Sequence, residues 1–211
     1  MSPSLNSLPY RPGREIARGG MGAVLDTPDP KLARSVALKV MLRRQASDGE
    51  LQRFLQEARV LGQLAHPNIV PVHDLGTDAH GRLFYTMKLV KGVTLRAVLD
   101  ALRAGDADTA AKYPLTQLLT VFQKVCDAMA FAHARGVIHR DLKPDNIMVG
   151  EFGEVLVMDW GLAKVGAAGA PGPASRQPAS RVAIDPALLR EVETHRQERS
   201  EDTRLNSSHV A

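Results

Sequence analysis

The stretch from Val137 to Lys164 reads VIHRDLKPDNIMVGEFGEVLVMDWGLAK, and the interpretation of the whole chain starts from it. Three short apolar runs alternate with polar loops in it, which is typical of short buried strands joined by turns. Asp141, Asn146 and Asp159 lie at the rims of the predicted strands. Their carboxylate and amide oxygens are hard ligands that suit Mg²⁺ carried on a phosphate. The pattern indicates phosphoryl-transfer chemistry, and a polar turn with ordinary capping residues is the alternative.

Two motifs in this stretch carry a resemblance. Residues 139–146 read His-Arg-Asp-Leu-Lys-Pro-Asp-Asn, which resembles the catalytic loop of eukaryotic-type protein kinases, a family that bacteria also carry. Residues 159–161, Asp-Trp-Gly, are similar to the metal-binding Asp-Phe-Gly turn of that family. A lysine two residues after the catalytic aspartate is the form of the loop that serine/threonine kinases carry. Eight consecutive matching residues make the resemblance strong.

The resemblance implies a role for each polar residue of the two motifs. Asp141 orients the substrate hydroxyl and takes its proton late, and Lys143 contacts the γ-phosphate. Asn146 and Asp159 hold Mg²⁺, so the implied cofactors are ATP and Mg²⁺. The implied phosphate acceptors are serine and threonine hydroxyls of proteins. An aspartate with an ordinary pKa of about 3.9 suits orientation of the hydroxyl better than strong base catalysis.

A glycine-rich segment from Gly13 to Leu25 lies between apolar runs near the start of the chain. By itself it favours an ordinary hairpin, although its backbone amides can also approach phosphates closely. The family's glycine pattern aligns with it, but Ala17 replaces the first glycine, which costs about 1 kcal/mol if φ is positive there. The resemblance implies that the phosphates are covered by Ala17, Arg18, Gly19, Gly20, Met21, Gly22 and Val24.

Two charged residues follow the glycine-rich segment. Lys39 ends the alternating sequence Val-Ala-Leu-Lys, which predicts a strand. Glu57 lies in a predicted helix that the capping box Ser47 to Glu50 opens. Each is most simply a solvated surface charge. The resemblance instead implies that Lys39 contacts the α- and β-phosphates and that Glu57 pairs with it, an ion pair whose loss would switch activity without unfolding the chain.

The resemblance also implies an adenine pocket and a stacked spine. Strand side chains form the walls of the pocket, and the backbone after Met87 binds the adenine edge. The implied lining residues are Val24, Ala37, Met87, Lys88, Val90 and Met148. Leu61, His139 and Trp160 match positions that stack into a spine in active kinases.

Hydrophobic periodicity predicts the remaining elements. We expect strands at 68–75 and 83–90, a short helix at 94–102, a polar loop at 104–113 and a long amphipathic helix at 116–135. Gly136 is expected to end the long helix. Its buried face is predicted to hold Leu118, Phe122, Val125, Cys126, Met129 and Ala132.

Composition sets limits on the class of protein. With Cys126 as the single cysteine among 211 residues, an internal disulfide is impossible and a reducing compartment is favoured. The net charge of +4 is modest and the chain has no basic block, so we expect no nucleic-acid partner. We expect neither a signal peptide in residues 1–12 nor a membrane segment, and we predict a cytoplasmic protein. The oligomeric state stays open.

We therefore predict an α+β, two-lobed protein-kinase-like fold. A small antiparallel sheet lobe with one regulatory helix precedes a partial, mostly helical C-lobe. The expected boundaries are a flexible leader at 1–12, the N-lobe at 13–90, the partial C-lobe at 91–165 and a low-complexity tail at 166–211. Because the tail is rich in Gly, Ala, Pro and polar residues, we expect the catalytic domain to be incomplete at its C-terminus.

Three functions remain open on the sequence alone. The first is a serine/threonine protein kinase that transfers the ATP γ-phosphoryl group to proteins. The second is a small-molecule phosphotransferase of the antibiotic-kinase type, which shares the fold. The third is an ATP-binding remnant or scaffold without turnover. The filled catalytic positions favour the first of these, and the short C-lobe favours the third.

Overall fold

A computed structural model describes residues 10–11, 13–19, 22–42, 46–78 and 81–166. Three predictions fall wholly or mostly outside this described part: the leader at 1–12, the positions of Gly20 and Met21, and the tail from 167 onward. The described chain divides into two compact units. The first holds the described residues of 10–51 and 73–87, and the second holds 52–72 and 88–166.

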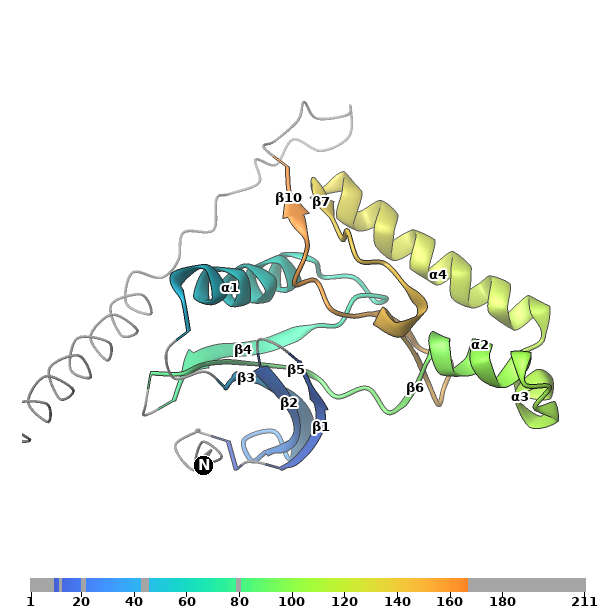
Figure 1. The fold of residues 1–211 in the computed structure, drawn as a ribbon, viewed down its shortest axis with the longest axis horizontal. Helices are drawn as coiled ribbons and strands as arrows, with labels where there is room; N and C mark the ends of the chain where they lie inside the picture. Colours follow the sequence, from blue (N-terminus) through green and yellow to red (C-terminus); the bar gives the residue numbers. More distant parts are fainter. Residues whose placement is uncertain (1–9, 12, 20–21, 43–45, 79–80, 167–211) are drawn as a thin grey trace, which may run out of the picture. The chain divides into compact units, whose positions relative to one another are not determined.

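The first unit is built on a five-stranded sheet with the order β1-β2-β3-β5-β4 (Figure 1). Both β1–β2 and β2–β3 are antiparallel neighbours. The strands are β1 (Arg14–Arg18), β2 (Gly22–Asp29), β3 (Arg34–Met41), β4 (Val72–Thr77) and β5 (Leu83–Lys88). β5 lies within the segment 83–90 that apolar alternation predicts, whereas β4 overlaps the predicted segment 68–75 but is shifted toward the C-terminus and ends at Thr77.

One face of this sheet carries a hydrophobic core. Because side chains alternate between the faces of a strand, every second residue of β2 and β3 contributes to it. The cluster consists of Ala23, Leu25, Leu38, Val40 and Phe84, with Tyr10 and Leu42 packed against it. Gly22 allows β2 and β3 to approach closely, since a Cβ there would clash with the Val40 carbonyl oxygen.

Helix α1 (Asp48–Gln63) begins where the capping box predicts. The Ser47 N–H donates to the Glu50 carboxylate at 2.8 Å, and the Glu50 N–H donates to the Ser47 hydroxyl at 3.3 Å. The two bonds satisfy amides that the helix itself leaves without partners. Its buried face includes Phe54, Leu55, Glu57, Ala58, Val60 and Leu61.

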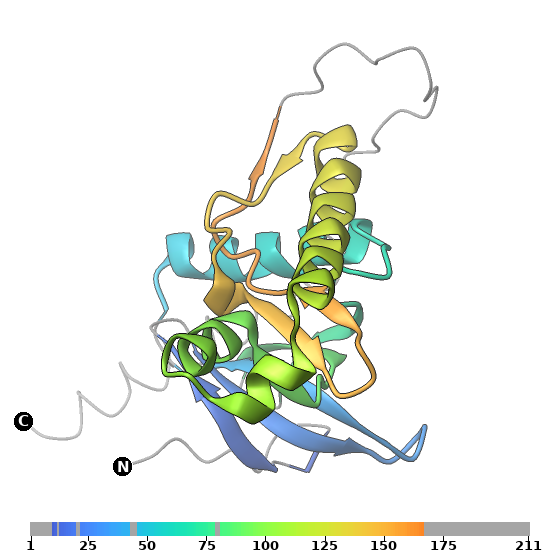
Figure 2. The same ribbon diagram turned by 90° about the vertical axis from the view of Figure 1, so that its right-hand side faces the viewer.

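The second unit combines most of helix α1 with short strands and further helices (Figures 1 and 2). Strands β6 (Gly92–Thr94), β8 (Ile147–Gly150) and β9 (Val155–Val157) form one antiparallel sheet, and β7 (Val137–Ile138) pairs with β10 (Lys164–Val165). The helices are α2 (Leu95–Arg103), α3 (Ala107–Lys112) and α4 (Leu115–Ala134), with a 3₁₀ turn η1 (Pro144–Asn146). Helix α4 packs against β7 and β9, and therefore supports the start of the predicted catalytic loop and the strand that precedes the Asp-Trp-Gly turn.

The loop expected at 104–113 contains a helix that sequence reasoning missed. Asp106 caps α3 by accepting the Thr109 N–H at 2.7 Å. An aspartate three residues before a threonine, followed by alanines, was the available signal. The helix has only six residues, too few for apolar periodicity to reveal it.

Helix α4 has the predicted length, and its predicted buried face is confirmed at Val125 and Ala132 but wrong at Phe122 and Cys126. The buried residues are Val121, Val125, Ala128 and Ala132. Phe122 is 66% exposed, and Cys126 is exposed as well. The helix turns its small alanines toward the short strands because they allow close packing, and its larger side chains at 115, 119 and 122 point outward. Gly136 ends the helix region with φ 72°, as predicted.

No helix among the described residues is long and apolar enough to cross a membrane.

The buried face of α4 makes a testable prediction. Val121→Ala should lower the free energy of unfolding by about 2 kcal/mol, because it removes two methylene equivalents from a site that is 1% exposed and leaves a cavity. Phe122→Ala on the same helix turn should change it by no more than about 0.5 kcal/mol. Urea unfolding of both variants measures the difference. A larger loss for the phenylalanine variant would contradict the assigned face.

Candidate active site

The catalytic loop begins at a buried histidine. His139 lies directly after β7, and its Nδ1 accepts the Asp141 N–H at 3.2 Å. Because Nδ1 accepts, Nε2 must carry the ring hydrogen, and it lies 2.9 Å from the Met158 carbonyl oxygen. The imidazole therefore connects the Asp141 backbone amide to the Met158 carbonyl, which directly precedes Asp159. Arg140 takes a positive φ of 65° between these contacts, and its Nε donates to the Leu162 carbonyl at 2.7 Å.

Asp141, Lys143 and Asn146 form a compact polar group. The Lys143 ammonium lies 2.8 Å from Asp141 Oδ2. The Asn146 side-chain amide donates to the Asp141 carbonyl at 2.9 Å and to its carboxylate at 3.1 Å. The η1 turn sets this spacing, since the Asn146 N–H also donates to the Lys143 carbonyl at 2.9 Å. Three of the predicted site residues are therefore brought together.

The contacts shift the ionisation of both charged members. The hydrogen bond from Lys143 is the main influence that lowers the pKa of Asp141, and the Asn146 amide adds to it against a smaller opposing effect of burial. The same bond raises the pKa of Lys143, and the nearby carboxylates of Asp145 and Asp159 add to that effect. Asp141 is therefore an anion and Lys143 a cation at neutral pH, which suits orientation of a hydroxyl and contact with a phosphate.

The Asp-Trp-Gly turn follows β9 and is connected to the catalytic loop by the backbone. The Met158 N–H donates to the Asn146 carbonyl at 2.8 Å. Asp159 has a positive φ of 55°, a conformation that aspartate tolerates better than most residues and that is often found at functional sites. Trp160 is 1% exposed, with its ring centroid 4.6 Å from that of His139. The larger ring at 160 thus packs on the histidine.

Glu57 is buried and lies beside this turn. It is only 2% exposed, so the interpretation of a solvated helix charge is wrong. Glu57 Oε2 and Asp159 Oδ1 each lie 3.3 Å from the point where a Cβ of residue 161 would stand, so glycine at 161 leaves room for both carboxylates. Gln56 on the same helix donates to the Ala163 carbonyl at 3.3 Å, which holds α1 next to the turn.

The donor set fits a magnesium ion that arrives on phosphates. The Asn146 amide nitrogen is used by Asp141, so its carbonyl oxygen is the atom that can bind a cation. The exposed carboxylate of Asp159 would supply a second oxygen. Mg²⁺ commonly takes only one or two protein oxygens, with phosphates and waters filling the other positions. Among the described residues, no group of three or more His, Cys, Asp or Glu side chains could hold a metal.

In the first unit, several predicted nucleotide residues share one sheet face. Ala17 on β1 is paired with Val24 on β2, and Val24 with Lys39 on β3, so the three side chains form a row. Ala37 lies two residues before Lys39 and therefore on the same face. Ala17 is a strand residue outside the set with positive φ, so the expected cost of about 1 kcal/mol does not arise.

Tyr85 is a residue that sequence reasoning missed. The Lys39 ammonium lies 5.7 Å from the centroid of its ring, within the range of a cation–π contact. Strand alternation places Tyr85 and Met87 together on β5, and both are buried. The signal for it was weak, because a tyrosine in a strand of apolar residues is ordinary core composition.

The remaining predicted residues lie in both units. Arg18 is exposed at the end of β1 and pairs with Glu15, and the Gly19 N–H donates to the Gly22 carbonyl at 2.9 Å. In the second unit, the Lys88 N–H donates to the Pro71 carbonyl at 3.0 Å, so only its carbonyl can contact an adenine edge. Val90 is partly buried, as is Met148, which lies on β8.

The predicted site residues thus form two groups. Asp141, Lys143, Asn146, Asp159 and Glu57 come together in the second unit. Lys39 and its row belong to the first unit. The ion pair between Lys39 and Glu57 stays a prediction.

Replacing Lys143 by methionine should raise the pKa of Asp141 toward its ordinary value, because the lysine hydrogen bond is the main influence that lowers it. A titration of the Asp141 side-chain carboxyl carbon by NMR, without metal, measures this shift. Lys124→Met is the matched control, since that ammonium donates to the Gly153 carbonyl instead. An Asp141 pKa that stays equally low in the Lys143 variant would contradict the assigned contact.

Comparison with known proteins agrees with this geometry. The model of the protein kinase domain family matches residues 10–194. The serine/threonine-protein kinase PknD of Chlamydia caviae is 42% identical over 155 residues, which cover 71% of this chain and 16% of the relative. PknD of Protochlamydia amoebophila is 39% identical over 160 residues, covering 74% and 16%. The chain therefore spans about a sixth of the length of these curated relatives. Since the family model covers most of the chain, the chain belongs to the protein kinase domain family.

Proposed function

We propose that this chain is the catalytic part of a serine/threonine protein kinase, which transfers the γ-phosphoryl group of Mg-ATP to serine or threonine hydroxyls of proteins. The observation that carries the proposal is the group of Asp141, Lys143 and Asn146 with its contacts of 2.8 to 3.1 Å. An ionised carboxylate, a lysine beside it and an amide oxygen are the parts that this transfer requires.

Each residue contributes by position and charge. Asp141 accepts a hydrogen bond from the attacking hydroxyl, and the proton passes to its carboxylate late in the transfer. Lys143 can leave Asp141 for an oxygen of the transferred phosphate, because its ammonium is on a flexible four-carbon stem. Asn146 and Asp159 would hold Mg²⁺, which supplies positive charge on the phosphates. Lys39 would bind the α- and β-phosphates.

The names of the relatives support this proposal over the alternatives. The PknD proteins are named serine/threonine-protein kinases. Lys143, two residues after Asp141, is the serine/threonine form of the loop. The acceptor is therefore proposed to be a protein hydroxyl, and the place of action is proposed to be the cytoplasm, where ATP is present.

Asp141→Asn should reduce phosphate transfer to a serine-containing protein such as casein by at least about 100-fold, the scale of a lost acid–base group. Incorporation of labelled γ-phosphate measures this. Binding of Mg-ATP should change little, because asparagine keeps the size and the bond from Asn146 to the Asp141 backbone carbonyl. Lys124→Met, distant from these contacts, should transfer at the rate of the unaltered chain.

Two results would contradict the proposal. Mg-ATP binding without any transfer that depends on Asp141 would favour a nucleotide-binding scaffold. Phosphorylation of an aminoglycoside, with no phosphorylation of casein or of the chain itself, would favour a small-molecule phosphotransferase.

A further inference from the structure

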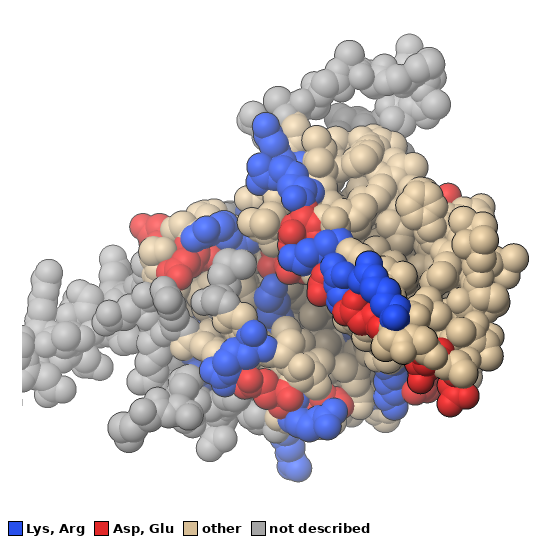
Figure 3. Space-filling view, turned by 45° about the vertical axis from the view of Figure 1, so that its right-hand side comes forward, with Lys and Arg blue, Asp and Glu red and all other residues tan. Residues whose placement is uncertain are grey.

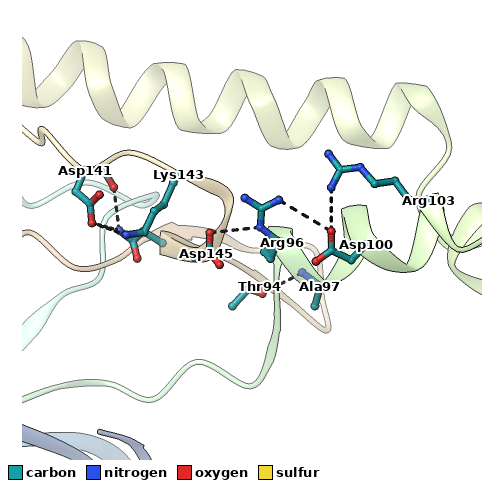
Figure 4. A network of polar contacts seen from close by, with 9 residues as sticks. Thr94, Arg96, Ala97, Asp100, Arg103, Asp141, Lys143 and Asp145 are labelled. Atoms are coloured by element: carbon teal, nitrogen blue, oxygen red, sulfur yellow. Dashed lines mark hydrogen bonds and ion pairs between the residues drawn. The ribbon is translucent and has the colours of Figure 1, made fainter. Parts of the chain in front are cut away.

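A line of charges of alternating sign leads from helix α2 to the catalytic loop. Figure 4 shows this line of charges at close range. In the space-filling view of Figure 3, Lys and Arg side chains alternate with Asp and Glu side chains on the face toward the viewer. In order along the line, the charges are Arg103, Asp100, Arg96, Asp145, Lys143 and Asp141. Its last two members belong to the proposed transfer machinery. The other four, Arg103, Asp100, Arg96 and Asp145, have been assigned no role in the transfer.

Arg96 contacts a carboxylate on each side, and the start of its helix is fixed by a cap and a strand pairing. Its Nε lies 3.4 Å from Asp145 Oδ2, and its guanidinium lies 4.0 Å from the Asp100 carboxylate. Thr94 caps α2 by accepting the Ala97 N–H at 3.1 Å. Thr94 also pairs with Met148 on β8, the strand that directly follows η1. The start of α2 and the end of the catalytic loop are therefore joined by a strand ladder, which sets Arg96 opposite Asp145.

Lys143 lies near the carboxylates of Asp141, Asp145 and Asp159. It binds Asp141 at 2.8 Å, and the charge of Asp145, two residues further along the loop, also favours its ammonium form. Its side chain is 47% exposed, and nothing in its four-carbon stem prevents the ammonium from turning toward either Asp141 or Asp145. An unpaired Asp145 would therefore compete with Asp141 for Lys143.

We propose that Arg96 is a positioning residue, which occupies Asp145 and so keeps Lys143 at Asp141. The inference rests on the proposed phosphoryl transfer, because the position of the Lys143 ammonium affects a rate only in that reaction. Arg96 acts through Asp145 and Lys143 and does not itself touch the reacting atoms.

The ion pair between Arg96 and Asp145 positions Lys143 and adds little to the stability of the fold. Their side chains are 40% and 48% exposed, and ion pairs as exposed as this one contribute about 0–1 kcal/mol to folding. Substitutions at either position should therefore leave the chain folded. The effect on rate can still be large, since a displacement of about 1 Å in a catalytic group can cost about 100-fold.

The test compares four variants in the full chain: Arg96→Gln, Asp145→Asn, the double variant and Arg103→Gln. Arg96→Gln should lower kcat about threefold to tenfold, a fraction of the loss that a full 1 Å displacement causes, with little change in KM for Mg-ATP. The double variant should recover kcat to within about twofold, because the competing carboxylate is gone. Arg103→Gln is the matched control on the same helix and should leave kcat unchanged, since Arg103 contacts only Asp100 among these charges.

A second readout does not depend on activity. The ¹H–¹⁵N signal of the Lys143 ammonium group should shift in Arg96→Gln and return toward its original position in the double variant. If the unaltered chain transfers no phosphate, this signal still tests the inference, so its failure and the failure of the proposed function are distinguishable. A Lys143 signal that ignores Arg96→Gln, or a double variant as slow as the single one, would overturn the proposal.

Discussion

The side-chain amide of Asn146 is the contact on which the candidate site depends. It donates to both the backbone carbonyl and the carboxylate of Asp141, at 2.9 and 3.1 Å. The backbone carbonyl of Asn146 accepts the Met158 N–H at 2.8 Å, directly before Asp159. One buried residue therefore fixes Asp141 and the Asp-Trp-Gly turn relative to each other. These contacts hold their geometry well, because breaking any one of them leaves a buried donor or acceptor unpaired.

Two positive-φ residues belong to this arrangement. Arg140 and Asp159 adopt φ values of 65° and 55°, which cost about 1–3 kcal/mol each in non-glycine residues. His139 lies between the two segments and contacts both, with one ring nitrogen to each. The ring of Trp160 covers it. The packing of these two rings, together with the Asn146 contacts, gives the surrounding structure that keeps the strained backbone in place.

Much of the second unit follows from its sequence in simple physical terms. The short strands around the catalytic loop and before the Asp-Trp-Gly turn could be predicted from apolar runs of two to four residues. The end of α4 could be predicted from Gly136, which has a φ of 72° in the structure. The buried face of α4 could not be read in the same way, because large apolar side chains lie all around this helix. Close packing of Ala128 and Ala132 on the strands selects one face, and that depends on tertiary contacts that periodicity does not contain.

The candidate site shows the same division. The motifs give Asp141, Lys143, Asn146 and Asp159, since their residue types and spacing carry the chemistry. The burial of Glu57 and the contact of Tyr85 with Lys39 depend on which strands and turns lie beside them, and single residues in a helix or strand give no sign of that. The alternating charges along α2 were likewise hidden, because Arg96 and Asp145 are far apart in sequence.

The central claim is that Asn146 presents its side-chain oxygen to a metal that comes with the nucleotide. Paramagnetic Mn²⁺ added with ADP at substoichiometric amounts tests this most directly, with the side-chain amide signals of Asn146 and Asn68 compared by NMR. Asn68 is the internal control, because its amide donates to the Val155 carbonyl at 2.9 Å and is assigned no metal. The predicted result is that the Asn146 signals broaden beyond detection while those of Asn68 persist. Equal broadening of both, or persistence of the Asn146 signals when nucleotide is bound, would contradict the claim.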